Sequence, residues 1–164
     1  MNRLALYMRT VIFGVTDSLV STVGLLAGLN AAGAPHRLIV LTGVVYALVE
    51  AFSMAVGDFL SEESAEEYTA QGAVSDTAPL FASIVMFFTF AIVALIPVAP
   101  YLLLGDPQAL GVSIILSIFA LFVVGAVGAR FSRVPMLWRG ARMALLGGGA
   151  ILIGIVVGAV FPEI

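Results

Sequence analysis

Five apolar stretches, each long enough to cross a bilayer, occupy most of the 164 residues. They cover about residues 11–32, 38–60, 80–104, 109–129 and 141–161, and a membrane helix needs about 20 apolar residues. Hydrophobic residues make up 62% of the chain and charged residues only 10%, which is outside the range of soluble domains. Because lipid offers no partners to backbone polar groups, we predict an all-α membrane protein with five transmembrane helices, forming a single domain over residues 1–164.

The positions of the basic residues predict the orientation of the chain. Arginines lie at the start of the first span and between the fourth and fifth spans; they are Arg3, Arg9, Arg130, Arg133, Arg139 and Arg142, and only Arg37 and His36 lie in the turn after the first span. Positively charged loops stay in the cytoplasm, so we expect a cytoplasmic N-terminus and a C-terminus outside. The acidic segment 61–79 is then cytoplasmic. The simplest destination is the plasma membrane of a bacterium.

Asp17 interrupts the first span, in "FGVTDSLVSTVGLLAG". At about 1.5 Å per residue it lies roughly 9 Å below the membrane surface, where an aspartate is costly. Such an acid is expected to face a partner, a cavity or an ion. The plainer alternative is an interfacial acid whose carboxylate is capped by the hydroxyls of Thr16, Ser18 or Ser21.

The second span, "LVEAFSMAVGDFLSEE", places Glu50, Met54, Asp58 and Glu62 at four-residue intervals, on one stripe of a helix. Counting from the cytoplasmic side puts Met54 at about the depth of Asp17, so these side chains could converge. Carboxylates with a thioether suit Fe²⁺ or Mn²⁺ better than Mg²⁺ or Ca²⁺. Acids in a membrane can also exchange a proton for a metal. Met54 could instead be an ordinary packing residue.

Further acids follow in "SEESAEEYTAQ", among them Glu66 on the same stripe. They would line one side of a helical extension of the second span. Such a segment is either a solvated helix end or a funnel that collects cations at the cytoplasmic entrance. In the third span, a kink at Pro97 and Pro100 could open the helix near its outer end.

Glycine pairs in the first and fifth spans, Gly24 with Gly28 and Gly154 with Gly158, have the spacing that lets membrane helices approach closely. They favour packing within one chain, or alternatively a seam between two chains. An odd number of spans does not divide into two inverted halves, so a pathway open to both sides would more naturally need two chains.

Several classes of function lack their residues. The chain has no cysteine and one histidine, which argues against thiol chemistry and a zinc site. It has neither a phosphate-binding glycine loop nor a Ser/His/Asp arrangement, so we expect a transporter rather than an enzyme, with no permanently bound cofactor. We expect the lipid bilayer, divalent cations and protons as partners, and no nucleic acid.

The stretches "FGVTDSLVSTVGLLAG" and "EAFSMAVGDFLS", with the third-span run from Pro79 to Leu103, resemble the vacuolar iron transporter family. The resemblance covers essentially the whole chain. It implies a homodimer of five-helix subunits that exports Fe²⁺, and often Mn²⁺, from the cytoplasm in exchange for protons, along a path at the dimer interface lined by the first two helices.

Asp17, Glu50 and Met54 match the path residues of that family. Asp58 stands where the family usually has Glu, and Ser18 replaces a common Gly. Members with a cytoplasmic metal-binding domain insert a long helical bundle after the second span, whereas this chain has a short segment and so resembles the shorter, bacterial-type members.

We therefore predict proton-coupled Fe²⁺/Mn²⁺ export, with both ions as transported substrates. The predicted metal ligands are Asp17, Glu50, Met54, Asp58, Glu62 and Glu66, and Asp17 and Glu50 are the predicted proton-coupling groups. Two alternatives remain: a passive divalent cation channel with the same ligands, and a membrane module that binds a partner helix without transporting anything.

Overall fold

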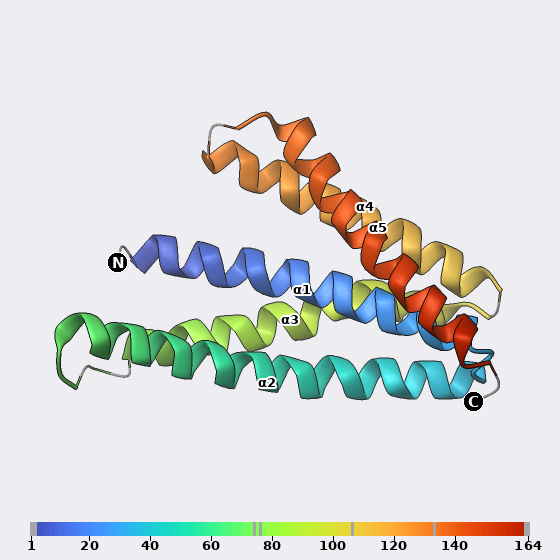
Figure 1. Cartoon of the computed structure of the whole chain (residues 1–164), viewed down its shortest axis with the longest axis horizontal. Coiled ribbons are helices and arrows are strands. Elements are labelled where there is room, and N and C mark those ends of the chain that lie inside the picture. The colour runs from blue at the N-terminus through green and yellow to red at the C-terminus, as the bar shows by residue number, and fades with distance from the viewer. Residues whose placement is uncertain (1–2, 74, 76, 106, 133, 163–164) are drawn as a thin grey trace.

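The chain folds into five long helices joined by short turns (Figure 1). The computed structural model describes residues 3–73, 75, 77–105, 107–132 and 134–162. The helices are α1 (Arg3–Ala31), α2 (His36–Ala70), α3 (Thr77–Leu103), α4 (Gln108–Ser132) and α5 (Met136–Val160). All five are long and apolar enough to cross a membrane, which confirms the predicted fold class.

Figure 1 shows that α1 begins at one end of the bundle, the N-end, and that α5 finishes at the other, the C-end. The turn between α4 and α5 lies on the N-end side, so Arg9 lies toward the same end as Arg130, Arg139 and Arg142. The turn that precedes Arg37 lies at the C-end. Predicted Arg133 is outside the described residues.

The helix ends differ from the predicted spans most clearly in α2. Hydropathy places the end of this span at residue 60, but the helix continues through the acidic residues to Ala70. Hydropathy marks only the part of a helix that suits hydrocarbon, whereas the backbone hydrogen bonds continue into water. Gln71 then stops the helix in a left-handed conformation, with φ 53°, and its N–H is donated to the carbonyl of Glu67.

α3 is the central support of the bundle, because both α1 and α2 pack against it. On the α2 side the contact uses small residues, Ala47 and Ala51, against Phe90 and Ala94 of α3. On the α1 side the buried Ser18 hydroxyl donates a hydrogen bond of 2.8 Å to the carbonyl of Phe90. The two helices that carry the predicted site are thus held on one scaffold.

The two prolines do not interrupt α3, which continues to Leu103. The carbonyl of Pro97 accepts a 2.8 Å hydrogen bond from the buried Ser113 hydroxyl of α4. Beyond Pro100, the imidazole of His36 donates to the carbonyl of Tyr101 over 2.8 Å. Side chains of neighbouring helices therefore supply hydrogen bonds around the prolines, as membrane helices require.

The glycine pairs of α1 and α5 pack on each other within the chain, which decides between the two sequence-based readings. A methyl group at Gly154 would overlap the carbonyl oxygen of Gly24, and one at Gly158 would overlap that of Gly28. The helices therefore approach so closely that only glycine fits at the crossing.

Toward the N-end, α4 and α5 diverge from α1 (Figure 1). An apolar cavity of about 530 Å³ lies between α1 and α4 here. Its lining comes from the first half of α1 and the second half of α4, including Val11, Val15, Val124 and Val127. This cavity is called the wedge below. It separates part of α1 from α4 near the N-end, whereas α1 packs closely on α5 at the C-end.

Candidate functional site

The predicted stripe of α2 lies at the edge of the face that packs on α3. Glu50 and Met54 are half-buried, the side chains of Asp58 and Glu62 are almost enclosed, and Glu66 on the acidic extension of α2 is half-buried. The neighbouring faces differ sharply: Ala47 and Ala51 are buried against α3, while large apolar residues such as Leu48, Val49 and Phe52 are exposed. The stripe therefore runs along α2 between the face that packs on α3 and the face that is exposed.

The hydroxyls near Asp17 are occupied elsewhere. Thr16 donates to the carbonyl of Ile12 over 2.7 Å, and Ser21 donates to the backbone carbonyl of Asp17 over 2.6 Å. Ser18 donates to α3, as described above. Because a hydroxyl has a single proton to donate, none of the three is left to cap the Asp17 carboxylate. The capping alternative thus loses its expected donors.

Tyr46 joins α1 to α2 beside Asp17. The Tyr46 hydroxyl lies near the Ser21 hydroxyl and near the carboxylates of Asp17 and Glu50. Asp17 precedes Ser21 by one helical turn, and Glu50 follows Tyr46 by one turn. In antiparallel helices the two carboxylates therefore lie at the same level.

This register differs from the depth count made on the sequence, which placed Met54 beside Asp17. A second contact between the helices supports the observed register, because the hydroxyl of Thr10 donates to the carboxylate of Asp58 over 3.4 Å. The sequence count assumed where each span begins, and one turn of error in that assumption moves the partner by one turn.

A charged cluster closes the N-end of the stripe. Arg9 of α1 donates to the Glu62 carboxylate over 2.9 Å. The same guanidinium nitrogen lies 3.9 Å from the carboxylate of Asp58. The structure thus places these two predicted ligands next to the same positive charge.

Beside this cluster is a cavity of about 530 Å³, called the stripe cavity below. Polar groups and two thioethers share its lining, which comprises Arg9, Thr10, Phe13, Ser53, Met54, Gly57, Asp58, Ser61 and Met86. Oxygen and sulfur atoms are the donor set expected for a borderline divalent cation.

The predicted acids come together as two pairs rather than as one cluster. Asp17 and Glu50 lie around Tyr46, and Asp58 and Glu62 lie around Arg9. Among the residues that the structure describes, no three Asp, Glu or His side chains are close enough together to hold one metal ion. A single subunit therefore presents a series of partial sites along α2.

Two residues of this arrangement were missed as site residues. Tyr46 lies one four-residue step before Glu50 on the same stripe, a signal that the sequence carries. Arg9 was interpreted only as an orientation signal, because a sequence does not show which acid an arginine of another helix meets.

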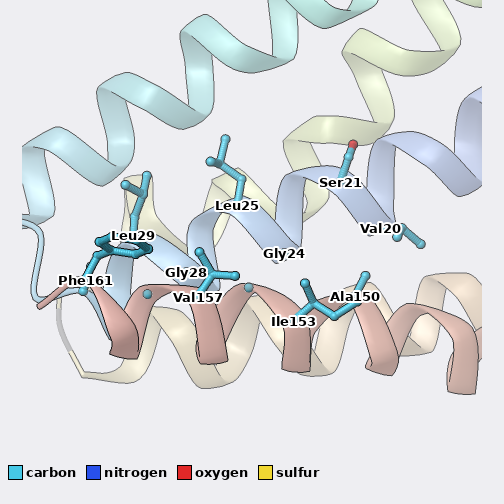
Figure 2. Close-up of a pocket in the computed structure, with 13 residues that line it drawn as sticks. Val20, Ser21, Gly24, Leu25, Gly28, Leu29, Ala150, Ile153, Val157 and Phe161 are labelled. Carbon is cyan, nitrogen blue, oxygen red and sulfur yellow. The ribbon is translucent and has the colours of Figure 1, made fainter.

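Another cavity, of about 490 Å³, lies along the crossing of α1 and α5. Figure 2 shows lining residues from both helices, among them Leu25 and Leu29 of α1 and Ile153 and Val157 of α5. Its lining is almost wholly apolar and holds no carboxylate, so this groove offers no ligands to a metal ion.

A family model and individual relatives both relate this chain to the same group of proteins. The model of the VIT family matches residues 8–73 and 69–159. Vacuolar iron transporter homolog 4 of Arabidopsis thaliana is 30% identical over 157 residues, covering 88% of this chain and 78% of that protein. Vacuolar iron transporter homolog 5 of Oryza sativa subsp. japonica is 29% identical over 164 residues, covering 93% and 78%. Vacuolar iron transporter 1 of Tulipa gesneriana is 38% identical over 61 residues, which are 37% of this chain and 25% of that protein.

Proposed function

The chain belongs to the VIT family, and on that premise we propose that it exports Fe²⁺, and also Mn²⁺, from the cytoplasm in exchange for protons. The names of its relatives as vacuolar iron transporter homologs support the iron substrate. The observation that supports the proposal is the register of α1 against α2, given by the Thr10–Asp58 and Arg9–Glu62 hydrogen bonds, from which Asp17 and Glu50 are inferred to lie at one level. Two carboxylates at one depth of an apolar bundle are expensive unless they serve a cation.

The remaining predicted ligands extend this pair toward the N-end. Met54 follows Glu50 on the stripe and lines the stripe cavity with Asp58. Glu62 and Glu66 continue onto the extension of α2. With the N-end in the cytoplasm, an ion would meet Glu66 and Glu62 first, then Asp58 and Met54, and finally Glu50 and Asp17.

Proton coupling is assigned to Asp17 and Glu50. A carboxyl group without water around it is stable either protonated or bound to a cation, so metal and proton compete for the same oxygens. Release of the metal on the far side then leaves a group that takes up a proton there.

The pathway is proposed to lie between two copies of the chain. Asp17 and Glu50 are only half-buried in one subunit, although both lie within membrane-spanning helices. In a lone subunit they would border hydrocarbon, which is costly for carboxylates. A second stripe facing the first would cover them and would bring four acids to one level. The cellular destination is proposed to be a bacterial plasma membrane, with the C-end outside.

The test is transport by the purified chain in liposomes. Fe²⁺ uptake should follow an imposed pH gradient, and Asp17→Asn or Glu50→Gln should abolish it. Glu67→Gln is the matched control, because it makes the same change on the exposed part of the α2 extension and should leave the flux intact.

Uptake that persists in both path variants would contradict the assignment. Two further outcomes identify the alternatives. Metal flux that ignores the pH gradient would indicate a passive channel, and a chain that binds no divalent cation by calorimetry would indicate a nontransporting module.

A further inference from the structure

Arg9 contributes the positive charge in the cluster at the N-end of the stripe. Its guanidinium lies against two carboxylates, those of Glu62 and Asp58, at 2.9 and 3.9 Å. Both acids are almost enclosed, with side-chain exposures of 3% and 8%. Two enclosed negative charges thus share one positive charge, and the three groups together keep one negative charge.

The Arg9 guanidinium and the two carboxylates differ in how easily each can move out of the cluster. The Arg9 side chain is 54% exposed, whereas the carboxylates are held on short stems inside the bundle. An arginine has a long flexible side chain, so its head can move into water without any change of backbone. The guanidinium is therefore the replaceable member of the cluster.

Charge decides what can replace it. A divalent cation that displaces the guanidinium neutralises both carboxylates and removes the remaining negative charge. A monovalent cation only substitutes one single charge for another, and it must also displace a group tethered to the chain. Coulomb interactions are strong at such partly enclosed positions, so this difference favours divalent ions.

The stripe cavity gives a cation a route to Asp58, where it could displace the Arg9 guanidinium. Arg9 and Asp58 both line the stripe cavity together with Met54, and the buried Met86 forms part of its wall. An ion that reaches Asp58 through this cavity meets hydroxyl and thioether groups together with the carboxylate.

We propose that Arg9 is a specificity-determining residue at the cytoplasmic entrance: its guanidinium occupies the Asp58 and Glu62 carboxylates until a divalent cation displaces it. This inference rests on the proposed function, because it treats the two acids as the first buried ligands on the path. It assigns to Arg9 the discrimination between divalent and monovalent cations.

The first experiment measures Mn²⁺ binding to the purified full-length chain, from the loss of the electron paramagnetic resonance signal of free Mn²⁺. Arg9→Gln should lower the Kd by about tenfold, the effect of removing one competing charge. It should also make binding sensitive to added K⁺, which the wild type resists. Arg9→Lys should resemble the wild type, and Arg37→Gln at the C-end is the matched control. Unchanged or weaker Mn²⁺ binding in a folded Arg9→Gln protein would overturn the proposal.

The double variant Arg9→Gln/Glu62→Gln separates competition from a structural role. Removing the acid together with its arginine should cancel the gain in affinity. Persistence of the gain without Glu62 would show that the two groups are not a competing pair, and would also overturn the proposal.

A second measurement needs no variant and so does not depend on the fold tolerating one. Phenylglyoxal modifies accessible arginines, and mass spectrometry locates the products. Saturating Mn²⁺ should speed modification of Arg9 in the wild type while leaving Arg37 unchanged. Equal or slower modification of Arg9 in the presence of bound Mn²⁺ would overturn the proposal. A wild type that binds neither Mn²⁺ nor Fe²⁺ would instead contradict the proposed function itself.

Discussion

Contacts between single side chains of α1 and α2, such as the Thr10–Asp58 hydrogen bond, set the register of the two helices that carry the acids. The four-residue spacing from Glu50 to Glu62 correctly indicated one stripe of a helix, since α2 is continuous over these residues. It did not predict that Asp17 lies level with Glu50. That register depends on the contacts of Tyr46 with Ser21 and of Thr10 with Asp58, which join separate helices. The metal-binding roles of these residues stay predictions.

Tyr46 provides the first prediction. Tyr46→Phe keeps the ring that packs beside Ala47 and Ala51 but removes the hydroxyl that meets Ser21. Loss of this polar contact should lower the free energy of unfolding by at most about 1 kcal/mol. Because the same hydroxyl lies beside Asp17 and Glu50, Fe²⁺ flux in liposomes should fall severalfold while the protein stays folded. Full flux would show that Tyr46 only joins the helices.

Met54 provides the second. Met54→Leu preserves volume, and such exchanges in a packed region usually cost less than about 1.5 kcal/mol. A thioether ligand favours Fe²⁺ over Mg²⁺, so the variant should bind Fe²⁺ more weakly while its weak affinity for Mg²⁺ stays the same. Competition calorimetry under anaerobic conditions measures both. Met86→Leu, the equivalent change on α3, tests whether the second thioether of the stripe cavity contributes. An unchanged preference in both variants would assign the two sulfurs to packing alone.

Among the helices, the sequence predicted their number and placed both ends of α3 and α4 within three residues, but it missed the C-terminal end of α2. Hydropathy reports residues that suit hydrocarbon, so it could not see that α2 continues to Ala70 through acidic residues. The glycine pairs signalled a close approach without naming the opposite helix. The structure supplies that partner, because Gly24 and Gly28 of α1 face Gly154 and Gly158 of α5.

The α1–α5 crossing provides the third prediction. In Gly154→Ala, the added methyl group meets the backbone carbonyl of Gly24, which cannot rotate away. The helices must separate, and overpacking of this kind costs about 1–3 kcal/mol. Gly149→Ala is the matched control, since a methyl group at that position of α5 meets nothing within 4 Å. Thermal unfolding in one detergent should show a lower midpoint for Gly154→Ala only. Equal midpoints would mean that the crossing is looser than described.

At the scale of the whole molecule, the border position of the acid stripe leads to a prediction about assembly. Half-buried carboxylates along α1 and α2 would be covered if a second copy packed on that face. The chain has no cysteine, so a single introduced one reports contacts without background. Ser53→Cys, on the exposed side of the stripe, should form a covalent dimer in membranes under mild oxidation.

The control for assembly lies on the opposite part of the bundle. Ile115 of α4 is 68% exposed, and Ile115→Cys should remain monomeric under the same conditions. A dimer formed through Ile115 but not through Ser53 would move the interface to α4 and would leave the acids facing lipid. The sequence suggested two copies through the odd number of spans, the glycine pairs and the family resemblance, but it could not show which face of the chain would meet the second copy.

The wedge between α1 and α4 has a consequence for how the molecule must be handled. Its lining of valines and other apolar groups gives water nothing to bind, so in a bilayer we expect acyl chains to fill it. Lipid then acts as a packing element for the half of α1 that carries Arg9 and Thr10. Stripping those lipids with a harsh detergent would remove support from the helix opposite the acids, and its stability should return when long-chain lipid is added back.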